Sequence, residues 1–316
     1  MRILVTGATG FIGKALCRYL SERGHEVLAG VRRRLGGSCN GVLIVELGTL
    51  GIDTVAPEKL AGVNAVVHLA SRVHVMRESA TDPLADYRRT NVDGTVSMVQ
   101  AAAKAGVRRF VFVSSIKVNG DDSGDTVFDE NSAPAPADPY GVSKWEAEQA
   151  LAALALSAGV EHVVLRPPLI YGPGVGANVL RLIRLVDAGW PLPFASVHNR
   201  RSMLALGNLC DAIACSLNHP EAAGRTFLVS DGADISTPDL IRSIARALER
   251  PCRLFPVPPM LLKKLAETIG RGAEADRLLG SLAIDPSRIQ SHLHWTPPLR
   301  FDDAIKATVD AYRIRI

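Results

Sequence analysis

The chain of 316 residues lacks the features that mark several classes of protein. Its five cysteines form no C-x-x-C pair and no cluster with histidine, so neither a disulfide framework nor a zinc site is predicted. No apolar run reaches the roughly 18 residues that a membrane span needs. Basic residues gather compactly only at Arg32, Arg33 and Arg34, without aromatic residues between them, which argues against nucleic acid as a partner.

The remaining composition is that of an ordinary globular protein. Hydrophobic residues make up 47% of the chain, enough for a substantial core in one large domain or two coupled ones, and the formal net charge of +4 is mild. A strand begins directly at the N-terminus without the layout of a signal peptide, and scattered cysteines fit reduced thiols. We therefore expect a cytoplasmic protein without membrane insertion and without a metal site.

Residues 1–165 alternate short apolar runs with helical patterns. Periodicity predicts helices at Phe11–Leu20, Asp93–Ala105 and Tyr140–Ser157. The predicted strands are Arg2–Thr6, Glu26–Val31, Val42–Val45, Ala65–Leu69, Arg109–Ser114 and His162–Leu165. Near-continuous apolar strands that alternate with helices predict an α/β fold with a Rossmann-type doubly wound parallel sheet, and such sheets bind ligands at the carboxyl ends of their strands.

Prolines and glycines interrupt this pattern after Arg166. We expect the chain to return to the sheet within 202–230, through a strand at Phe227–Ser230. Residues 166–201 and 231–316 are expected to form a smaller mixed cap that binds substrate, while 1–165 form the dinucleotide-binding domain. The helices expected in the cap lie near Pro238–Leu248, Leu261–Ile269 and Asp302–Tyr312.

A glycine-rich loop joins the first predicted strand to the first helix, with the sequence Thr6-Gly7-Ala8-Thr9-Gly10-Phe11-Ile12-Gly13. Gly7 permits a tight turn, and Gly10 lets the backbone approach a pyrophosphate at the helix N-terminus. Gly13 allows the helix to pack closely on the strand. Placed directly between a strand and an amphipathic helix, the loop predicts a dinucleotide-binding site.

The end of the second strand bears on which dinucleotide binds. NAD sites usually carry an acid there, but this chain has Val31 followed by Arg32. Without a carboxylate to repel it, a 2′-phosphate is favoured near Arg32, so NADP is preferred over NAD; the alternative is that Arg32–Arg34 form a solvated loop. Glu46 and Leu47 are expected near the adenine.

Tyr140 and Lys144 form a candidate proton-transfer pair. Asp138 can cap a helix whose first position suits Pro139, and residues four apart then share one face. A cation near a phenol favours the phenolate and lowers a pKa that is ordinarily about 10. The spacing alone is weak evidence, because it arises readily by chance.

Five motifs in the expected order make the pair informative. Besides the glycine loop and Tyr140/Lys144, they are Val67-His-Leu-Ala70, Asn91-Val-Asp-Gly-Thr95 and Phe110–Gly120, where a buried strand ends in two serines. The chain thereby resembles the extended short-chain dehydrogenase/reductase family, in its NAD(P)-dependent nucleotide-sugar epimerase/dehydratase group. The resemblance covers nearly the whole chain, since Arg166–Pro173 and Asn199–Ser202 are similar to later landmarks of the family.

The resemblance implies a role for each motif. Ser115 would hydrogen-bond the substrate oxygen, Tyr140 would exchange the proton, and Lys144 would hold the nicotinamide ribose. Lys117 and Arg201 would contact substrate, Arg201 at a position that often binds a diphosphate. Plainer readings are a strand-end cap for Ser115, a helix cap for Asn91 and a surface charge for Arg201. The expected cofactor contacts are Gly7, Thr9, Gly10, Phe11, Ile12, Gly13, Arg32, Glu46, Leu47, Leu69, Ala70, Ser71, Asn91, Val113, Tyr140, Lys144 and Pro167.

Departures from the family pattern narrow the reaction. Sugar dehydratases carry an Asp-Glu pair where this chain has Ile116 and Lys117, which cannot supply the acid and base, so we exclude a dehydratase. Asn119 replaces a usual tyrosine and Leu169 an asparagine common among epimerases; both changes are expected on the sugar side of the pocket and weaken a UDP-galactose epimerase reading. His74 and Arg72 line either the sugar pocket or an exposed loop.

The string Ser114–Gly120 looks most like reductases of 4-keto-6-deoxy-N-acetylhexosamine nucleotides, which implies hydride transfer to a UDP-linked ketone in surface-polysaccharide synthesis. The first alternative is a 4-epimerase of UDP-hexose or UDP-N-acetylhexosamine that retains NAD. The remote alternative is a dinucleotide-binding sensor without turnover. Relatives often pair through the helices predicted here near 93–105 and 140–157, so we expect a homodimer.

Overall fold

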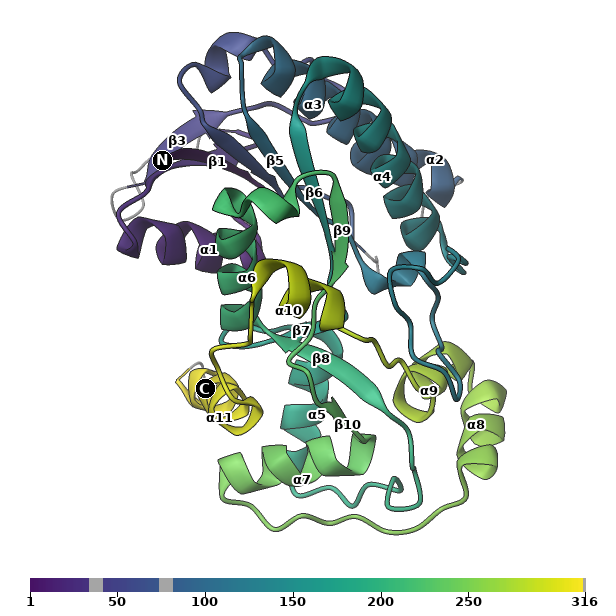
Figure 1. The fold of residues 1–316 in the computed structure, drawn as a ribbon. Helices are drawn as coiled ribbons and strands as arrows, with labels where there is room; N and C mark the ends of the chain where they lie inside the picture. Colours follow the sequence, from purple (N-terminus) through teal and green to yellow (C-terminus); the bar gives the residue numbers. More distant parts are fainter. Residues whose placement is uncertain (34–41, 74–81, 315–316) are drawn as a thin grey trace.

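The computed structural model describes residues 1–33, 42–73 and 82–314. A seven-stranded sheet, in which every neighbouring pair is parallel, runs through the larger lobe in the order β3-β2-β1-β4-β5-β6-β9 (Figure 1). Its strands are β1 (Arg2–Thr6), β2 (Glu26–Val31), β3 (Leu43–Glu46), β4 (Ala65–His68), β5 (Arg109–Val113), β6 (Glu161–Arg166) and β9 (Arg225–Leu228). The predicted doubly wound α/β fold is confirmed.

The strands are apolar on both faces because helices cover both. On one face Ile3 and Val5 pack with residues of α1 (Phe11–Glu22), α6 (Leu206–Asn218) and α10 (Ser287–Leu293). On the other, Leu4 and Phe112 pack with α3 (Gly94–Lys104) and α4 (Pro139–Ala158). Alternate residues of one strand therefore enter two separate cores, which accounts for the near-continuous hydrophobic runs in the sequence.

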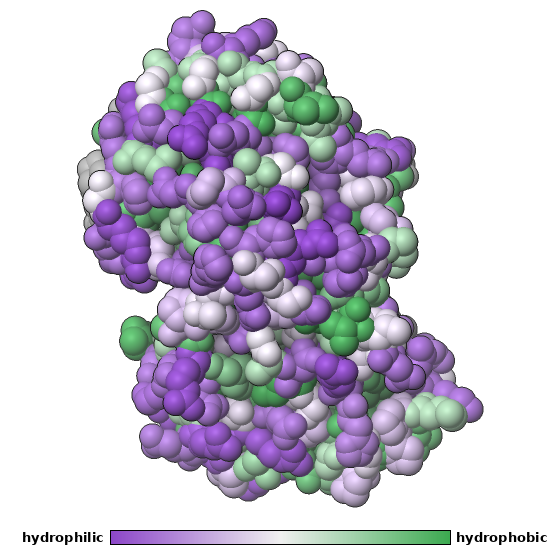
Figure 2. Space-filling view, in the orientation of Figure 1, coloured by the Kyte–Doolittle hydropathy of each residue, from purple (hydrophilic) through white to green (hydrophobic). Residues whose placement is uncertain are grey.

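A smaller lobe is built on a second sheet of three strands, β7 (Leu169–Tyr171), β8 (Arg201–Ala205) and β10 (Asp234–Ile235). A third core joins this sheet to α5 (Ala177–Asp187), α7 (Thr237–Leu248) and α11 (Phe301–Arg313). Helices α8 (Pro259–Thr268) and α9 (Gly272–Leu279) pair at its edge (Figure 1). In Figure 2 the outline narrows between the two lobes, and the face in view is mostly hydrophilic.

The short elements of the larger lobe complete the order. They are α2 (Pro83–Arg88), the single turns η1 (Pro57–Leu60), η3 (Ile116–Val118) and η4 (Pro220–Ala222), and a π-helical turn η2 (Arg89–Asp93). Among the residues described, no helix is long and apolar enough to cross a bilayer.

Two segments bear on the predicted division of the chain. The division assigned 202–230 to the larger domain, but β8, most of which lies in that range, belongs to the small sheet. It assigned 231–316 to the cap, but Ile289 and Leu293 of α10 pack in the core under β9 and β6. The division into a dinucleotide domain and a cap remains a prediction. After β10 the chain also returns to the core of the larger sheet at α10, before α11 packs in the smaller lobe.

Candidate active site

The glycine loop follows β1, where the strand order of the sheet reverses: β2 and β3 lie on one side of β1, and β4 to β6 lie on the other. Gly7 adopts a left-handed φ of 66°, and a Cβ there would meet the Ala70 nitrogen at 2.9 Å. A Cβ on Gly13 would lie 2.2 Å from the Gly7 carbonyl oxygen, so α1 packs too closely for any side chain at this position. Gly7 and Gly13 are thus required by the backbone geometry.

The first turn of α1 fits a dinucleotide pyrophosphate. Gly10 is its N-cap, no acidic residue lies in the turn, and a Cβ on Gly10 would meet only the Gly7 oxygen, at 3.2 Å. The backbone above Gly10 is therefore open, while the free N–H groups and the helix dipole favour an anion. Thr9, Gly10 and Phe11 also line a cavity of about 600 Å³ that extends to Tyr171 and Pro173 of the smaller lobe.

Thr6 connects the ends of β1 and β4. Its hydroxyl oxygen lies 2.9 Å from Nδ1 of His68 and accepts hydrogen bonds from the backbone nitrogens of Leu69 and Ala70, both at 3.1 Å. His68 is fully buried between Phe110 and Phe112, and this burial lowers its pKa to about 3. The predicted cofactor contacts Leu69 and Ala70 are thereby held beside the glycine loop.

Asn91 fixes the next part of the loop after β4. Its Oδ1 accepts hydrogen bonds from Ser71 Oγ at 2.9 Å and from the Arg72 nitrogen at 2.7 Å. Its Nδ2 donates to the Arg72 carbonyl at 3.1 Å and to Ser143 Oγ, on α4, at 2.9 Å. The residue lies in the π-helical turn η2, a distortion that is frequent at functional sites. Asn91 supports the loop and α4 and is not a simple helix cap.

Lys144 is buried under the end of β5. Its Nζ donates a 2.8 Å hydrogen bond to the Val113 carbonyl and lies 4.1 Å from the centroid of the Phe112 ring. Burial lowers the pKa of Lys144 to about 7, and the charge of Glu148 one turn further along α4 opposes that change. Asp138 caps this helix through the Gly141 nitrogen at 2.7 Å, as the sequence predicted.

Ser115 and Tyr140 meet at the mouth of the site. The Ser115 hydroxyl lies near enough to Tyr140 to act on its pKa, and the Tyr87 ring lies edge-on to Tyr140 with centroids 6.2 Å apart. Burial raises the pKa of Tyr140 to about 12; the Ser115 hydroxyl lowers it, and the charge of Asp138 raises it further. The structure thus brings Ser115, Tyr140 and Lys144 to one place, with the resting phenol protonated.

The three predicted substrate contacts lie in different settings. Ser115 faces Tyr140, whereas the Lys117 ammonium is engaged by Asp138 at 2.5 Å and by Asp121 at 2.8 Å. Arg201, on β8, donates to the Gly280 carbonyl at 3.0 Å, and burial lowers its pKa while Asp122 opposes this. The loop at Asp121 and Asp122 therefore lies near both cations, and the substrate roles of Lys117 and Arg201 stay predictions.

One interpretation of the sequence was wrong. Asn119 was expected on the sugar side of the pocket, but it is 1% exposed and its amide oxygen accepts a 2.9 Å hydrogen bond from Arg166. Arg166 also forms a buried ion pair with Glu148, at 2.6 Å. The sequence analysis missed Glu148, although its position four residues after Lys144 was a usable signal. Leu169 is 38% exposed at the start of β7.

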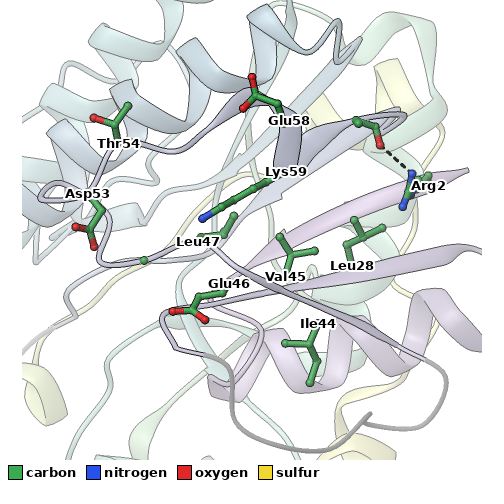
Figure 3. Close-up of a pocket in the computed structure, with 12 residues that line it drawn as sticks. Arg2, Leu28, Ile44, Val45, Glu46, Leu47, Asp53, Thr54, Glu58 and Lys59 are labelled. Atoms are coloured by element: carbon green, nitrogen blue, oxygen red, sulfur yellow. Dashed lines mark hydrogen bonds between the residues drawn. The ribbon is translucent and has the colours of Figure 1, made fainter.

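The remaining predicted cofactor contacts lie in several different settings. Val31 is buried at the end of β2, pairs in register with Glu46 at the end of β3, and is followed by the exposed Arg32. Glu46 and Leu47 line a cavity of about 610 Å³ together with Asp53 and Lys59 (Figure 3). The Pro167 carbonyl accepts from the Ile116 nitrogen at 3.0 Å, and Ile12 packs against the core. His74 and Arg34 lie outside the described residues.

With this geometry in hand, comparison with known proteins places the chain in a family. The profile of the "NAD dependent epimerase/dehydratase family" matches residues 3–230. The chain belongs to this family. It is therefore an NAD-dependent enzyme of the nucleotide-sugar epimerase and dehydratase type, as the sequence motifs predicted.

Individual relatives are similar over the full length. The chain is 41% identical to a "UDP-glucose 4-epimerase" of Vibrio cholerae, over 98% of this chain and 95% of that protein. It superposes on "MoeE5 in complex with UDP-glucuronic acid and NAD" with a TM-score of 0.79 and 26% identity, covering all of both chains. A UDP-N-acetylglucosamine 4-epimerase from Bacillus cereus shares the fold, with a TM-score of 0.80 at 20% identity and 99% coverage of each chain.

Proposed function

We propose that this family member is a 4-epimerase of a UDP-linked hexose or N-acetylhexosamine that retains NAD through the reaction. The observation that carries the proposal is the 41% identity to a UDP-glucose 4-epimerase along 98% of the chain. The convergence of the partly exposed Ser115 and Tyr140 near the buried Lys144 supports it, because inversion at C4 needs a proton acceptor and a hydrogen-bond donor at the same oxygen.

Three side chains of the site would have separate roles in this reaction. A bound NAD supplies the hydride acceptor, the hydride that returns, and a positive charge beside the phenol. Tyr140 would act as the phenolate, after losing its own proton to solvent: its Oη would take the proton of the sugar's C4 hydroxyl and give it back to the C4 oxygen when the hydride returns to the other face. Ser115 hydrogen-bonds the same oxygen, and Lys144, held by the Val113 carbonyl, stabilises the phenolate.

The 4-keto reductase reading loses one of its supports in the structure. It drew on Asn119 as a change at the sugar, and Asn119 instead bonds Arg166 in the interior. Val31 and Arg32 favoured NADP over NAD as the cofactor. The family is NAD-dependent, and MoeE5 was solved in complex with NAD, so we propose NAD for this chain.

Cofactor stoichiometry tests the proposal. Purified protein should carry NAD, convert UDP-glucose or UDP-N-acetylglucosamine to the C4 epimer, and show no net change in nicotinamide absorbance. Tyr140→Phe should keep the cofactor and lose activity by about 10²- to 10⁴-fold. Stoichiometric consumption of NADPH with a UDP-4-keto-6-deoxy sugar, without epimerisation of UDP-hexoses, would replace the proposal by the reductase.

We also propose that the enzyme works as a homodimer through α3 and α4. These helices pack on each other at one side of the sheet, and Leu156, near the end of α4, is 85% exposed. Light scattering coupled to size exclusion should give twice the chain mass of 33.8 kDa. A monomer at micromolar concentration would contradict the proposed homodimer and would leave the proposed epimerase activity unaffected.

A further inference from the structure

Lys117 joins two catalytic segments by its side chain. Its Nζ lies 2.5 Å from one carboxylate oxygen of Asp138 and 2.8 Å from Asp121. The other oxygen of Asp138 accepts from the Gly141 nitrogen at 2.7 Å and so caps α4. Tyr140 is the second residue of that helix, so the ion pair acts on the turn that carries the phenol.

The backbone of Lys117 makes the same connection. Its nitrogen donates to Ser115 Oγ at 3.3 Å, within the turn η3 that follows β5. A Cβ on Gly141 would lie 2.7 Å from the Lys117 carbonyl oxygen, so the two segments touch at the backbone. Lys117 therefore contacts Ser115 on one side and the first turn of α4 on the other.

We propose that Lys117 is a positioning residue for this chain's epimerase reaction: it holds Ser115 and Tyr140 at working distance and neutralises the Asp138 carboxylate beside the phenol. The proposal rests on the proposed function for its activity readout. This role replaces the substrate contact first expected of Lys117, because its ammonium is already paired with two carboxylates and its backbone nitrogen donates to Ser115.

The charges around Tyr140 determine whether each substitution should raise or lower its pKa. The groups that act on the phenol are Asp138 at the N-cap of α4, Ser115 after β5 and Tyr87 on α2, while Lys144 lies one turn further along α4. Burial contributes most to the raised pKa of Tyr140, and the Asp138 charge adds to it. A cation 2.5 Å from that carboxylate offsets its effect, so the two partners act on the phenol with opposite sign.

Two variants separate the partners. Lys117→Met leaves the charge of Asp138 without its cation, so the rising limb of the pH–activity profile should move to higher pH. Activity at neutral pH should then fall about tenfold for each pH unit by which this limb moves. Asp138→Asn keeps a good helix cap but removes the charge, so the same limb of the pH profile should move to lower pH. Lys117→Arg should restore the wild-type profile. Lys306→Met breaks an exposed pair with Asp310, at 2.8 Å, as the matched control and should shift nothing.

A substrate-free titration separates this inference from the proposed function. Tyrosinate absorbance, taken as the difference from the same protein with Tyr140→Phe, should move in opposite directions in Lys117→Met and Asp138→Asn. If it does so while UDP-sugars are not epimerised, the proposed function fails and the positioning role stands. A raised KM in Lys117→Met with an unmoved titration would mean substrate contact, and unmoved titrations in both variants would equally overturn the proposal.

Discussion

Glu148 and Arg166 form a buried ion pair one helical turn from Lys144. The Arg166 guanidinium donates to both carboxylate oxygens of Glu148, at 2.6 and 3.0 Å, and each side chain is 5% exposed. Glu148 lies one turn after Lys144 on α4, while Arg166 ends β6 and also bonds Asn119. The pair thus links the proton-transfer helix to the strand beside Ser115.

Breaking this pair should be costly. Glu148→Gln leaves the Arg166 charge buried without a counterion, and we expect a loss of about 3–5 kcal/mol in the free energy of unfolding. Urea denaturation measures it. Glu146 lies on the same helix as Glu148 and forms a more exposed ion pair with Arg88 of α2. Glu146→Gln breaks that pair and should change stability much less. Equal losses in the two variants would contradict a special role for the buried pair.

A methyl group at Gly13 should separate the glycine loop from its helix. The added carbon would approach the Gly7 oxygen to 2.2 Å and Ala8 Cα to 2.7 Å, and backbone cannot yield as a flexible side chain does. Gly13→Ala should cost about 1–3 kcal/mol and abolish retention of NAD. Gly176→Ala is the control, since a Cβ there meets nothing within 4 Å. Thermal unfolding and cofactor content report the two effects.

The buried ammonium of Lys144 should make stability depend on pH in the cofactor-free protein. Its pKa of about 7 when folded lies below the unfolded value of 10.5, so the unfolded chain binds more protons between these values and stability rises with pH there. Lys144→Met removes this term. We expect the variant to gain roughly 2–4 kcal/mol relative to wild type below pH 7, and the gain to vanish toward pH 10.5. Parallel stability curves across that range would contradict the burial cost.

Asn91 should matter for cofactor affinity more than for chemistry. Asn91→Leu removes four hydrogen bonds and frees the Ser71 loop from α4. Each unsatisfied buried group costs about 1–3 kcal/mol, so NAD affinity should fall at least tenfold. Calorimetric titration measures it, with Asn131→Leu on an exposed turn as control. An unchanged affinity would make Asn91 a helix residue only.

Local chemistry explains what the sequence could predict. The glycine loop, the Asp138 cap and the Tyr140/Lys144 spacing are each encoded within a few consecutive residues, and the parallel strands are apolar runs. The cap was predicted to be mixed, but its individual strands were not, because β7 has three residues and β10 two, and the pairing of β10 depends on β8, which is distant in sequence.

Side-chain partners were the hardest part to predict. Lys117 was assigned to substrate because its distance to Asp138, 21 positions away, is set only when η3 meets α4. Asn119 was misread for the same reason, since its partner Arg166 lies 47 residues on. Such contacts follow from tertiary packing and not from spacing, so the sequence could point to Ser115, Tyr140 and Lys144 but not to the side chains that hold them.

The hydrogen bonds of Thr6 fix the tautomer of His68. Because the Thr6 oxygen already accepts from Leu69 and Ala70, its one hydrogen goes to Nδ1, and the ring carries its proton on Nε2. That nitrogen is buried without a hydrogen-bond partner among the described residues. A second proton would force Thr6 to release one of the two backbone groups. Histidine often senses physiological pH, but burial lowers the pKa of His68 to about 3, so the ring is neutral at physiological pH and acid should loosen the backbone at Leu69 and Ala70 only near that low pH.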